Sequence, residues 1–320
     1  HIQWWSTHAQ RAVDMAARTS VARRQKGYGW FLYPGLGVLV VFFFGMFFWN
    51  VGISFLKWPG YGPAKWVGLD NFRNILDNKD FWESWIHGAF YVIPYALIPT
   101  FLGLVLAVAT YDAFVGKFGS KLVPVARTGF FLPQIVPIAV SGMIWMWMLD
   151  GSGGALNTFL EQLGMGEVTT EWLREPDTAL LSVAFFMLWL QTGFAYVVFL
   201  AGLSRLDPSV LEASQLDGAN WWQRLRWVTG PSLRPETFVV LLFLIVGALK
   251  VFAPVFYLTG GGPNGATMSP STFAIDSFFG GASVGIGSAL VTTLALIIGG
   301  LLGITFLIVR LRARAVNRDA

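Results

Sequence analysis

The feature that most constrains this chain is a series of long apolar stretches separated by shorter polar segments. A helix needs about 20 mostly apolar residues to cross a bilayer. Lipid offers the backbone no hydrogen-bond partners, so a spanning segment of this kind must be helical. Stretches that meet this requirement run approximately over 30–56, 86–111, 125–149, 178–203, 237–258 and 287–310. The sequence therefore predicts an all-α membrane protein with six transmembrane helices.

The composition agrees with this fold class. Charged residues make up only 12% of the 320 residues, against about 25% in soluble domains. The chain contains no cysteine, which excludes disulfides, thiolate metal ligands and a cysteine nucleophile. We expect no cleavable signal peptide, because the apolar stretch that follows the basic residues of 11–26 is too long for one.

The basic residues predict the orientation in the membrane. If the spans alternate in direction, most Lys and Arg fall on one side, in 1–29, 112–124, 204–236 and 311–320. The connections on the other side carry mainly acidic residues. By the positive-inside rule, both termini and the 204–236 connection are cytoplasmic. The chain is thus divided into an N-terminal arm (1–29), a six-span domain (30–310) and a basic tail (311–320).

No catalytic or metal-binding constellation is visible in the sequence. The three histidines are His1, His8 and His87, and they form no metal-ligand pair. There is no nucleophile elbow or carboxylate dyad either. The glycine-rich run GGGPNG at 260–265 lacks the Lys-Ser/Thr that a phosphate-binding loop carries. We therefore expect no catalytic residue, no metal site and no enzymatic activity in this chain.

Two places inside the predicted spans carry polar groups that lipid alone would not favour. Lys250 is the basic residue within the fifth stretch, where an intramembrane charge costs at least about 2.5–3.5 kcal/mol. It either lines a solute path or snorkels or pairs with a carbonyl freed near Pro254. Gln191 and Tyr196 flank Gly193 in the fourth stretch. They either form hydrogen bonds between helices or line the path of a polar solute.

One polar passage interrupts the apolar pattern more than any other. Residues 212–235 read EASQLDGANWWQRLRWVTGPSLRP, in which charged and apolar residues alternate around Asp217-Gly218. This composition predicts a short helix, a turn that glycine permits, and a second helix lying at the membrane surface. Such a segment is either offered to a partner protein or merely tethers the loop to the membrane.

The same passage resembles the signature of a known family, the membrane subunits of binding-protein-dependent ABC importers. The family pattern is EAA-x2-DGA, followed by I-x2-P-x-L-x-P. The matching positions are Glu212-Ala213-Ser214, Asp217-Gly218-Ala219, Val228, Pro231, Leu233 and Pro235. Ser214 and Leu225 are mild departures, standing where alanine and phenylalanine are common. Further passages are similar to the carbohydrate permeases of the maltose-transporter type, and within that type to the first of its two permease subunits: VGLDNFRNIL, RTGFFLPQIVPIAVSGMIWMWML and YLTGGGPNGAT.

The resemblance implies a type I ABC importer permease fold with a cytoplasmic EAA coupling helix at Ser209 to Asp217. That helix would sit in a groove of a cytoplasmic ATPase. The residues implied in coupling are Glu212, Ala213, Ser214, Asp217, Gly218 and Ala219. The chain itself would bind no cofactor, since ATP and Mg²⁺ belong to the partner ATPase dimer.

The resemblance also implies a solute site near the middle of the membrane and a docking surface outside it. The solute path would include Gln191, Gly193, Tyr196 and Lys250. The docking surface for an extracytoplasmic solute-binding protein would include Gly260, Gly261, Gly262, Pro263 and Asn264. The face of span five that contacts solute in the maltose type is apolar here. The large outer domain of some maltose-type permeases is absent, because residues 57–85 are too few to form it.

On this reading the chain is the permease subunit of an importer in the inner or plasma membrane of a prokaryote. Its partners would be a second homologous permease, the ATPase dimer, the solute-binding protein, a sugar and membrane lipid, with no nucleic acid. The cargo would be a di- or oligosaccharide, or alternatively glycerol phosphate or its diesters. A different class, the ion-gradient-driven secondary carrier, would require carboxylates within the membrane and inverted repeats, and the sequence shows neither.

Overall fold

The computed structural model describes residues 30–113, 122–280 and 283–316, and these are mostly helical. The strands in this part of the chain are β1 (Leu56–Lys57) and β2 (Lys65–Trp66), which pair antiparallel with Leu56 opposite Trp66. Four helices are long and apolar enough to cross a membrane, and the number rises to six if two bent helix pairs, 124–135 with 138–148 and 221–232 with 234–249, each count as one span. The prediction of an all-α chain with six spans is confirmed in this sense.

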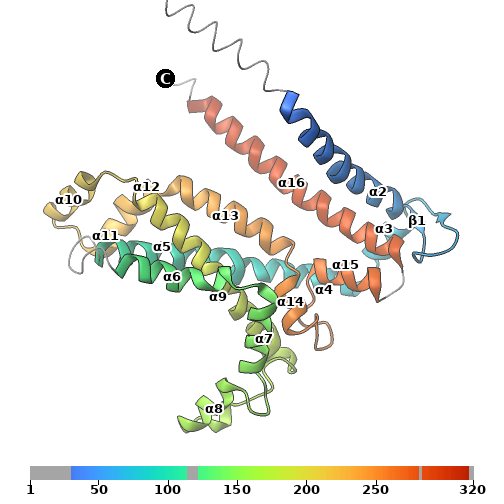
Figure 1. Cartoon of the computed structure of the whole chain (residues 1–320), viewed down its shortest axis with the longest axis horizontal. Helices are drawn as coiled ribbons and strands as arrows, with labels where there is room; N and C mark the ends of the chain where they lie inside the picture. The colour runs from blue at the N-terminus through green and yellow to red at the C-terminus, as the bar shows by residue number, and fades with distance from the viewer. Residues whose placement is uncertain (1–29, 114–121, 281–282, 317–320) are drawn as a thin grey trace, which may run out of the picture.

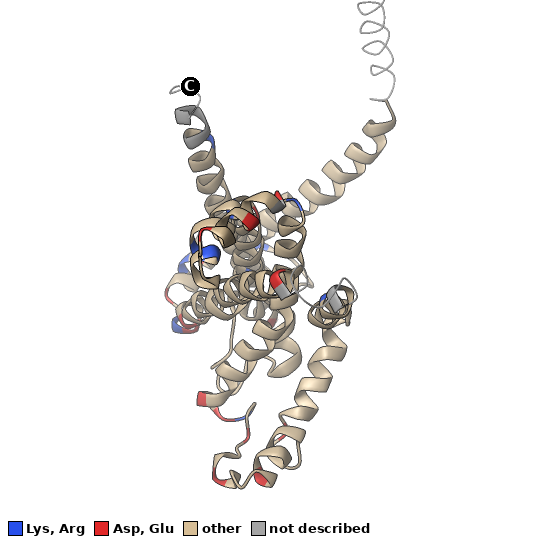
Figure 2. Cartoon of the chain, turned by 90° about the vertical axis from the view of Figure 1, so that its left-hand side faces the viewer, with Lys and Arg blue, Asp and Glu red and all other residues tan. Residues whose placement is uncertain are grey.

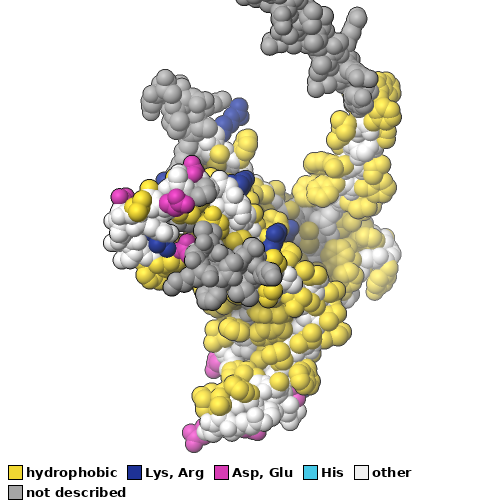
Figure 3. Space-filling model, turned by 60° about the vertical axis from the view of Figure 1, so that its left-hand side comes forward, with side chains coloured by type: hydrophobic (Ala, Val, Ile, Leu, Met, Phe, Trp, Pro, Cys, Tyr) yellow, Lys and Arg dark blue, Asp and Glu magenta, His cyan; other side chains and the backbone are white. Residues whose placement is uncertain are grey.

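The first and last spans form a pair that is joined near one end. Both stand away from the other helices over much of their length (Figure 1), and beyond their contact they diverge from each other (Figure 2). The first span runs from Trp30 to Ser54 and includes η1 (Val40–Phe44) and α2 (Gly45–Ser54). The last is α16 (Val284–Val316), which packs against α2. The Asn50 side chain joins them by donating to Thr292 Oγ1 at 3.1 Å. Hydrophobic side chains cover the long helices (Figure 3), so lipid or another protein must shield them from water.

Short elements tie this pair to the rest of the chain at one end. They are α3 (Asp70–Leu76) and α15 (Pro270–Phe279), both of which pack on α16. The buried side chain of Asn71 donates to the carbonyl oxygens of Ser54 and Leu56 at 2.8 and 2.9 Å. Ser54 is the last residue of α2 and Leu56 lies just beyond it, so Asn71 supplies hydrogen-bond donors for carbonyl groups that have no partner within the helix.

The remaining spans form the central body. A continuous helix comprises α4 (Lys79–Val92), η2 (Ile93–Leu97) and α5 (Ile98–Ala113), and it packs along α9 (Pro176–Leu203) and α13 (Arg234–Leu249). The backbones of α5 and α9 approach so closely that a side-chain carbon at Gly103 would lie 2.6 Å from Ala195 Cβ. The largest buried cluster lies between these helices and contains Tyr196, Phe199 and Leu244.

Two spans predicted as single helices are broken. The stretch 125–149 forms α6 (Leu122–Ile135) and α7 (Ile138–Met148), with a bend of 94° between them. The stretch 237–258 forms α13 and α14 (Ala253–Leu258), separated by residues 250–252. In both cases a proline lies at the start of the second helix. Proline lacks an N–H group, but at this position the N–H would have no partner within the helix, so no hydrogen bond is lost. Pro133, by contrast, remains inside α6.

Charges separate along the described chain. In Figure 2 the ribbon is coloured red at Asp and Glu residues around the end that holds α8 (Ala155–Gln162), whereas the blue Lys and Arg residues lie mostly toward the opposite end. The 204–236 connection lies at that opposite end, with α10 (Pro208–Leu216) projecting from the body (Figure 1). This separation agrees with the distribution from which the orientation in the membrane is predicted.

Candidate functional site

The connection 204–236 contains the helix, glycine turn and second helix that its sequence predicts. Asp207 is the N-cap of helix α10, and its carboxylate accepts a hydrogen bond from the Ser209 backbone N–H at 2.9 Å. This bond, together with the Ser209 side chain, holds the pKa of the Asp207 carboxyl below its usual range. The charge also lies at the positive end of the helix dipole. The start of α10 is therefore fixed by its own sequence.

Gly218 ends α10 in a Schellman motif. The Gly218 N–H donates to Gln215 O at 3.0 Å, and the Ala219 N–H donates to Ser214 O at 3.1 Å. These two bonds require a left-handed residue after the helix, and Gly218 has a φ of 76°. A side-chain carbon there would meet nothing within 4 Å, so backbone conformation alone favours glycine. The glycine of the Asp-Gly-Ala sequence is therefore explained by the left-handed backbone that this helix end requires.

Helix α10 has one packed side and one free side. Leu211 and Ser214 are buried, and the Ser214 hydroxyl donates to Leu211 O at 2.7 Å. Glu212 and Ala213 are exposed, and Leu216 is 89% exposed. Glu212 and Leu216, four positions apart, lie on the same exposed side of the helix.

The second helix, α11 (Trp221–Arg224), begins with a capping box. The Asn220 side chain accepts from the Gln223 N–H, and the Gln223 side chain accepts from the Asn220 N–H. Helix α11 continues into η5 (Leu225–Thr229) and α12 (Gly230–Ser232), and this segment meets α13 at 77°. Asp217 and Gly218 thus connect two helices whose facing ends are both capped.

Two ion pairs join the connection to the spans. Arg224 Nη2 lies 2.8 Å from Asp112 Oδ2 at the end of α5, with the side chains 17% and 23% exposed. Arg205 Nη2 lies 2.6 Å from Glu236 Oε1 at the start of α13. These four residues are not recognisable from the sequence, because the partners lie far apart in the chain and no local pattern links them. Their contacts join the residues on either side of α10 to α13 and α5.

In this conformation, the residues predicted to line a solute path in span four lie at helix contacts. Gln191 is 9% exposed, and its Oε1 accepts from Gln134 Nε2 at 3.0 Å. A side-chain carbon at Gly193 would collide with Phe130 O, which shows how closely α6 approaches α9. Tyr196 is fully buried, and within the described chain its hydroxyl has no hydrogen-bond partner. The assignment of these residues to a solute path stays a prediction.

Lys250 occupies the break in span five. It is the C-cap of α13, and its side chain is exposed. Among the ion pairs of the described residues, none involves Lys250. The break is fixed from the other side by Ser269, whose buried hydroxyl donates to Val251 O at 2.6 Å. A cation is therefore held at a fixed interruption of a spanning helix.

The glycine-rich segment after α14 is compact. Thr267 is fully buried, and its hydroxyl donates to Gly262 O at 2.8 Å, while Tyr91 Oη donates to Thr267 O at 2.8 Å. Gly260 and Asn264 are exposed, whereas Gly261 is buried against Met268. Of the residues predicted to dock a binding protein, these two exposed ones are accessible at the surface. The docking role itself stays a prediction.

Comparisons with known proteins agree on one family. Residues 100–317 match the family model described as "Binding-protein-dependent transport system inner membrane component". The chain is 31% identical to a probable ABC transporter permease of Bacillus subtilis (YurN), over 83% of this chain and 90% of the relative. It is also 31% identical to the trehalose/maltose transport system permease protein MalF of Thermococcus litoralis, over 90% of this chain and 93% of the relative.

A solved structure shows the same fold at lower identity. It is a bacterial alginate ABC transporter in complex with an alginate pentasaccharide-bound periplasmic protein. The match has a TM-score of 0.71 and 21% identity, and it covers 88% of this chain and 92% of that one.

Proposed function

We propose that this chain, which belongs to the family of binding-protein-dependent transport system inner membrane components, carries a sugar across the membrane in an ATP-driven importer. It would act with a second permease, a cytoplasmic ATPase dimer and an extracytoplasmic solute-binding protein. Both termini and α10 would lie in the cytoplasm, which follows from the positive-inside rule. The acidic end around α8 would lie outside.

The observation that carries this proposal is the construction of α10. The helix is capped at both ends and presents a free face with Glu212 and Leu216. The connection that contains it is joined to α13 and α5 through the ion pairs of Arg205 and Arg224, which flank the helix. A partner ATPase that seats this face and moves would displace α10 as a unit. The ion pairs at Asp112 and Glu236 would pass the displacement to two spans. ATP and Mg²⁺, bound by the partner, would supply the free energy.

The solute path would run along the broken spans. The α6–α7 and α13–α14 breaks interrupt backbone hydrogen bonding, and within a membrane such irregular backbone is tolerated where it is buried in protein or lines a cavity. Lys250 lies at one break, and Gln134 and Gln191 form a hydrogen bond near the other. Rocking of α6 against α9 would separate the contacts that now bury Gly193 and Tyr196. Alternating access would then expose them to solute.

Sugar is the favoured cargo because of the relatives. The relative from Thermococcus litoralis is named for trehalose and maltose, and the structural neighbour is an alginate transporter. One observation favours the second candidate, glycerol phosphate or its diesters: Lys250 is a cation with no ion-pair partner among the described residues. A phosphate would provide such a partner.

Crosslinking tests the proposed contact with an ATPase. The native chain has no cysteine, so Leu216→Cys creates a single thiol on the free face of α10. In native membranes, a bifunctional thiol–amine reagent should join the tagged chain to an ATPase subunit through this thiol. Trp66→Cys is the matched control, because it is 68% exposed but lies on β2, near the predicted outer end. Equal crosslinking of both variants, or a tagged chain that copurifies with no ATPase, would contradict the proposal.

A further inference from the structure

A polar pocket lies apart from the predicted solute path, at the acidic end of the described chain. Its volume is about 350 Å³, and it lies where the end of α7, the segment 150–174 and α14 meet. None of the residues assigned to the solute path lines it. The side chains that give it chemical character are Asp150, Glu171, Arg174, Phe256 and Tyr257.

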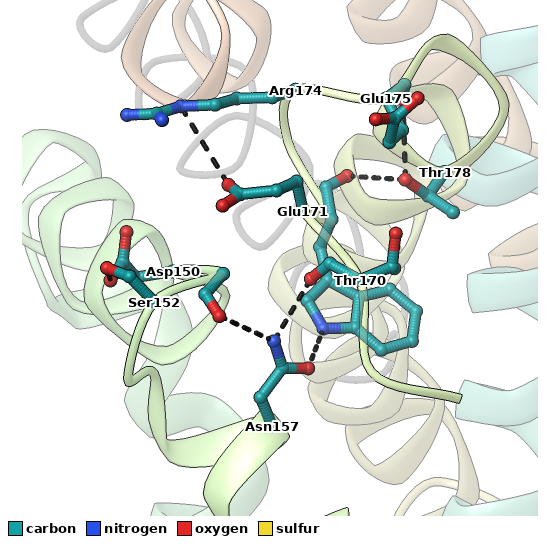
Figure 4. Close-up of polar contacts among 10 residues, drawn as sticks. Asp150, Ser152, Asn157, Thr170, Glu171, Arg174, Glu175 and Thr178 are labelled. Atoms are coloured by element: carbon teal, nitrogen blue, oxygen red, sulfur yellow. Dashed lines mark hydrogen bonds and ion pairs between the residues drawn. The ribbon is translucent and has the colours of Figure 1, made fainter. Parts of the chain in front are cut away.

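The charged wall of this pocket is held in place by Asn157 (Figure 4). Asn157 is 4% exposed, and its Nδ2 donates to Gly151 O at 3.1 Å and to Thr170 O at 3.0 Å. Its Oδ1 accepts from Trp172 Nε1 at 2.7 Å. One buried amide therefore joins the turn that carries Asp150 to the loop that carries Glu171. The pocket is built before any ligand arrives.

The Glu171 carboxylate lies directly over Gly151, where a side-chain carbon would collide with it. In Figure 4 it lies between Asp150 and Arg174. The Glu171–Arg174 contact is long, at 3.9 Å, and both side chains keep much of their exposure, at 42% and 79%. Asp150 accepts from the Ser152 hydroxyl at 2.8 Å. The two carboxylates and the guanidinium thus retain free hydrogen-bonding capacity toward the pocket.

This combination of groups suits a neutral molecule rich in hydroxyls. Carboxylate oxygens accept hydrogen bonds from hydroxyl groups, and the guanidinium donates them. Phe256, which is 50% exposed, and Tyr257 offer apolar ring surface to the C–H faces of a sugar. An anion would meet two negative charges against one positive charge. A pocket of this size lies within the roughly 300–1,000 Å³ of small-molecule sites.

We infer that this pocket is an outer solute site that binds a neutral saccharide before it passes between the spans. The inference rests on the proposed transport function and deepens it, since it selects a neutral cargo over a phosphorylated one. Tyr257 also packs against Gly142 of α7, so a solute in the pocket would contact the second half of each broken span, α7 and α14. Solute at the outer surface would thereby touch the elements that have to move.

The test measures binding of trehalose, maltose and glycerol 3-phosphate to the whole purified complex in lipid nanodiscs, without the solute-binding protein. Titration by saturation-transfer NMR gives the affinities. Asp150→Asn combined with Glu171→Gln removes both charges and keeps both shapes. We expect this double variant to bind the disaccharides about tenfold more weakly, because it loses charged acceptors. It should bind glycerol 3-phosphate more tightly, because the repulsion is gone.

Asp70→Asn combined with Asp77→Asn is the matched control, since it removes two exposed acidic groups of the same end outside the pocket. A second readout uses Met146→Cys, which places the chain's one thiol in the pocket wall. Disaccharide should slow its labelling by a membrane-impermeant maleimide added from outside.

Each outcome decides between distinct conclusions. Weaker disaccharide binding in the double variant with unchanged binding in the control supports the outer site. Absence of disaccharide binding to the wild-type complex, or equal binding to wild type and double variant, would overturn it. The proposed function is judged separately by ATP-dependent uptake in the wild-type complex. A complex that transports sugar but shows equal binding loses only the outer site.

Discussion

Breaking the ion pair between Asp112 and Arg224 should uncouple ATP hydrolysis from uptake. The pair is only 2.8 Å long, and its side chains are 23% and 17% exposed. It is therefore better shielded than surface pairs, which contribute about 0.2–1 kcal/mol, and a charged hydrogen bond contributes about 1.5–3 kcal/mol. We take about 2 kcal/mol for its loss, which corresponds to about a 30-fold change in an equilibrium constant.

In this account the affected equilibrium lies between a coupling segment seated on α5 and one displaced from it. Arg224→Ala and Asp112→Ala should each lower the amount of solute transported per ATP hydrolysed, by up to about 30-fold, while hydrolysis itself continues. The assay is parallel uptake and phosphate release in proteoliposomes that contain the whole complex. The exposed pair Asp70–Arg73, at 3.4 Å, provides the control, and Asp70→Ala should change neither quantity.

A charge swap sharpens the test. Asp112→Arg combined with Arg224→Asp restores an opposite-charge pair and places the cation at the end of α5, where the helix dipole favours it. Coupling should recover in the double variant relative to either single variant. Wild-type coupling in Arg224→Ala would refute the reasoning. Equal loss of hydrolysis and uptake would also refute it, because that result would show that the ion pair supports assembly of the complex and not its coupling.

Three further substitutions test single groups. Gly218→Val should reduce uptake, because a φ of 76° costs a side chain about 1–2 kcal/mol, whereas Gly218→Asn should be tolerated; equal uptake by both at equal membrane levels would remove the turn from the mechanism. Tyr196→Phe deletes a buried hydroxyl that has no partner among the described residues, so thermal stability in detergent should not fall while uptake does; wild-type uptake would deny the hydroxyl a role. Lys250→Met should change the KM for uptake and Lys250→Arg should not, and identical kinetics of both would leave Lys250 as a lysine that only snorkels.

The number of spans could be predicted from the sequence, but their breaks could not. A stretch of apolar residues has the same composition whether its helix is straight or bent by 94°, so the bend between α6 and α7 leaves no trace in hydropathy. The prolines were ambiguous too. Pro133 is accommodated within α6, whereas Pro137 precedes α7 as its N-cap. The difference depends on whether neighbouring helices supply partners for the freed carbonyls, which a single segment does not reveal.

The local structure of the 204–236 connection followed from its own residues. Asp207, Gly218 and Asn220 act within a few positions of themselves, as caps and a turn, so their pattern predicts the geometry. The anchors of the connection did not follow, because Arg224 meets a residue 112 positions away. Asn157 was missed for a related reason, since its role depends on two turns that the tertiary fold brings together.

The most direct test of the central claim is ATP hydrolysis and uptake by the reconstituted whole complex, with the solute-binding protein added from outside. We predict that the binding protein loaded with a neutral sugar stimulates ATP hydrolysis. It should drive uptake only when ATP is present inside the vesicles, where the ATPase subunits of correctly oriented complexes lie. Uptake that proceeds without ATP and follows an ion gradient would contradict it, and so would hydrolysis that no loaded binding protein stimulates.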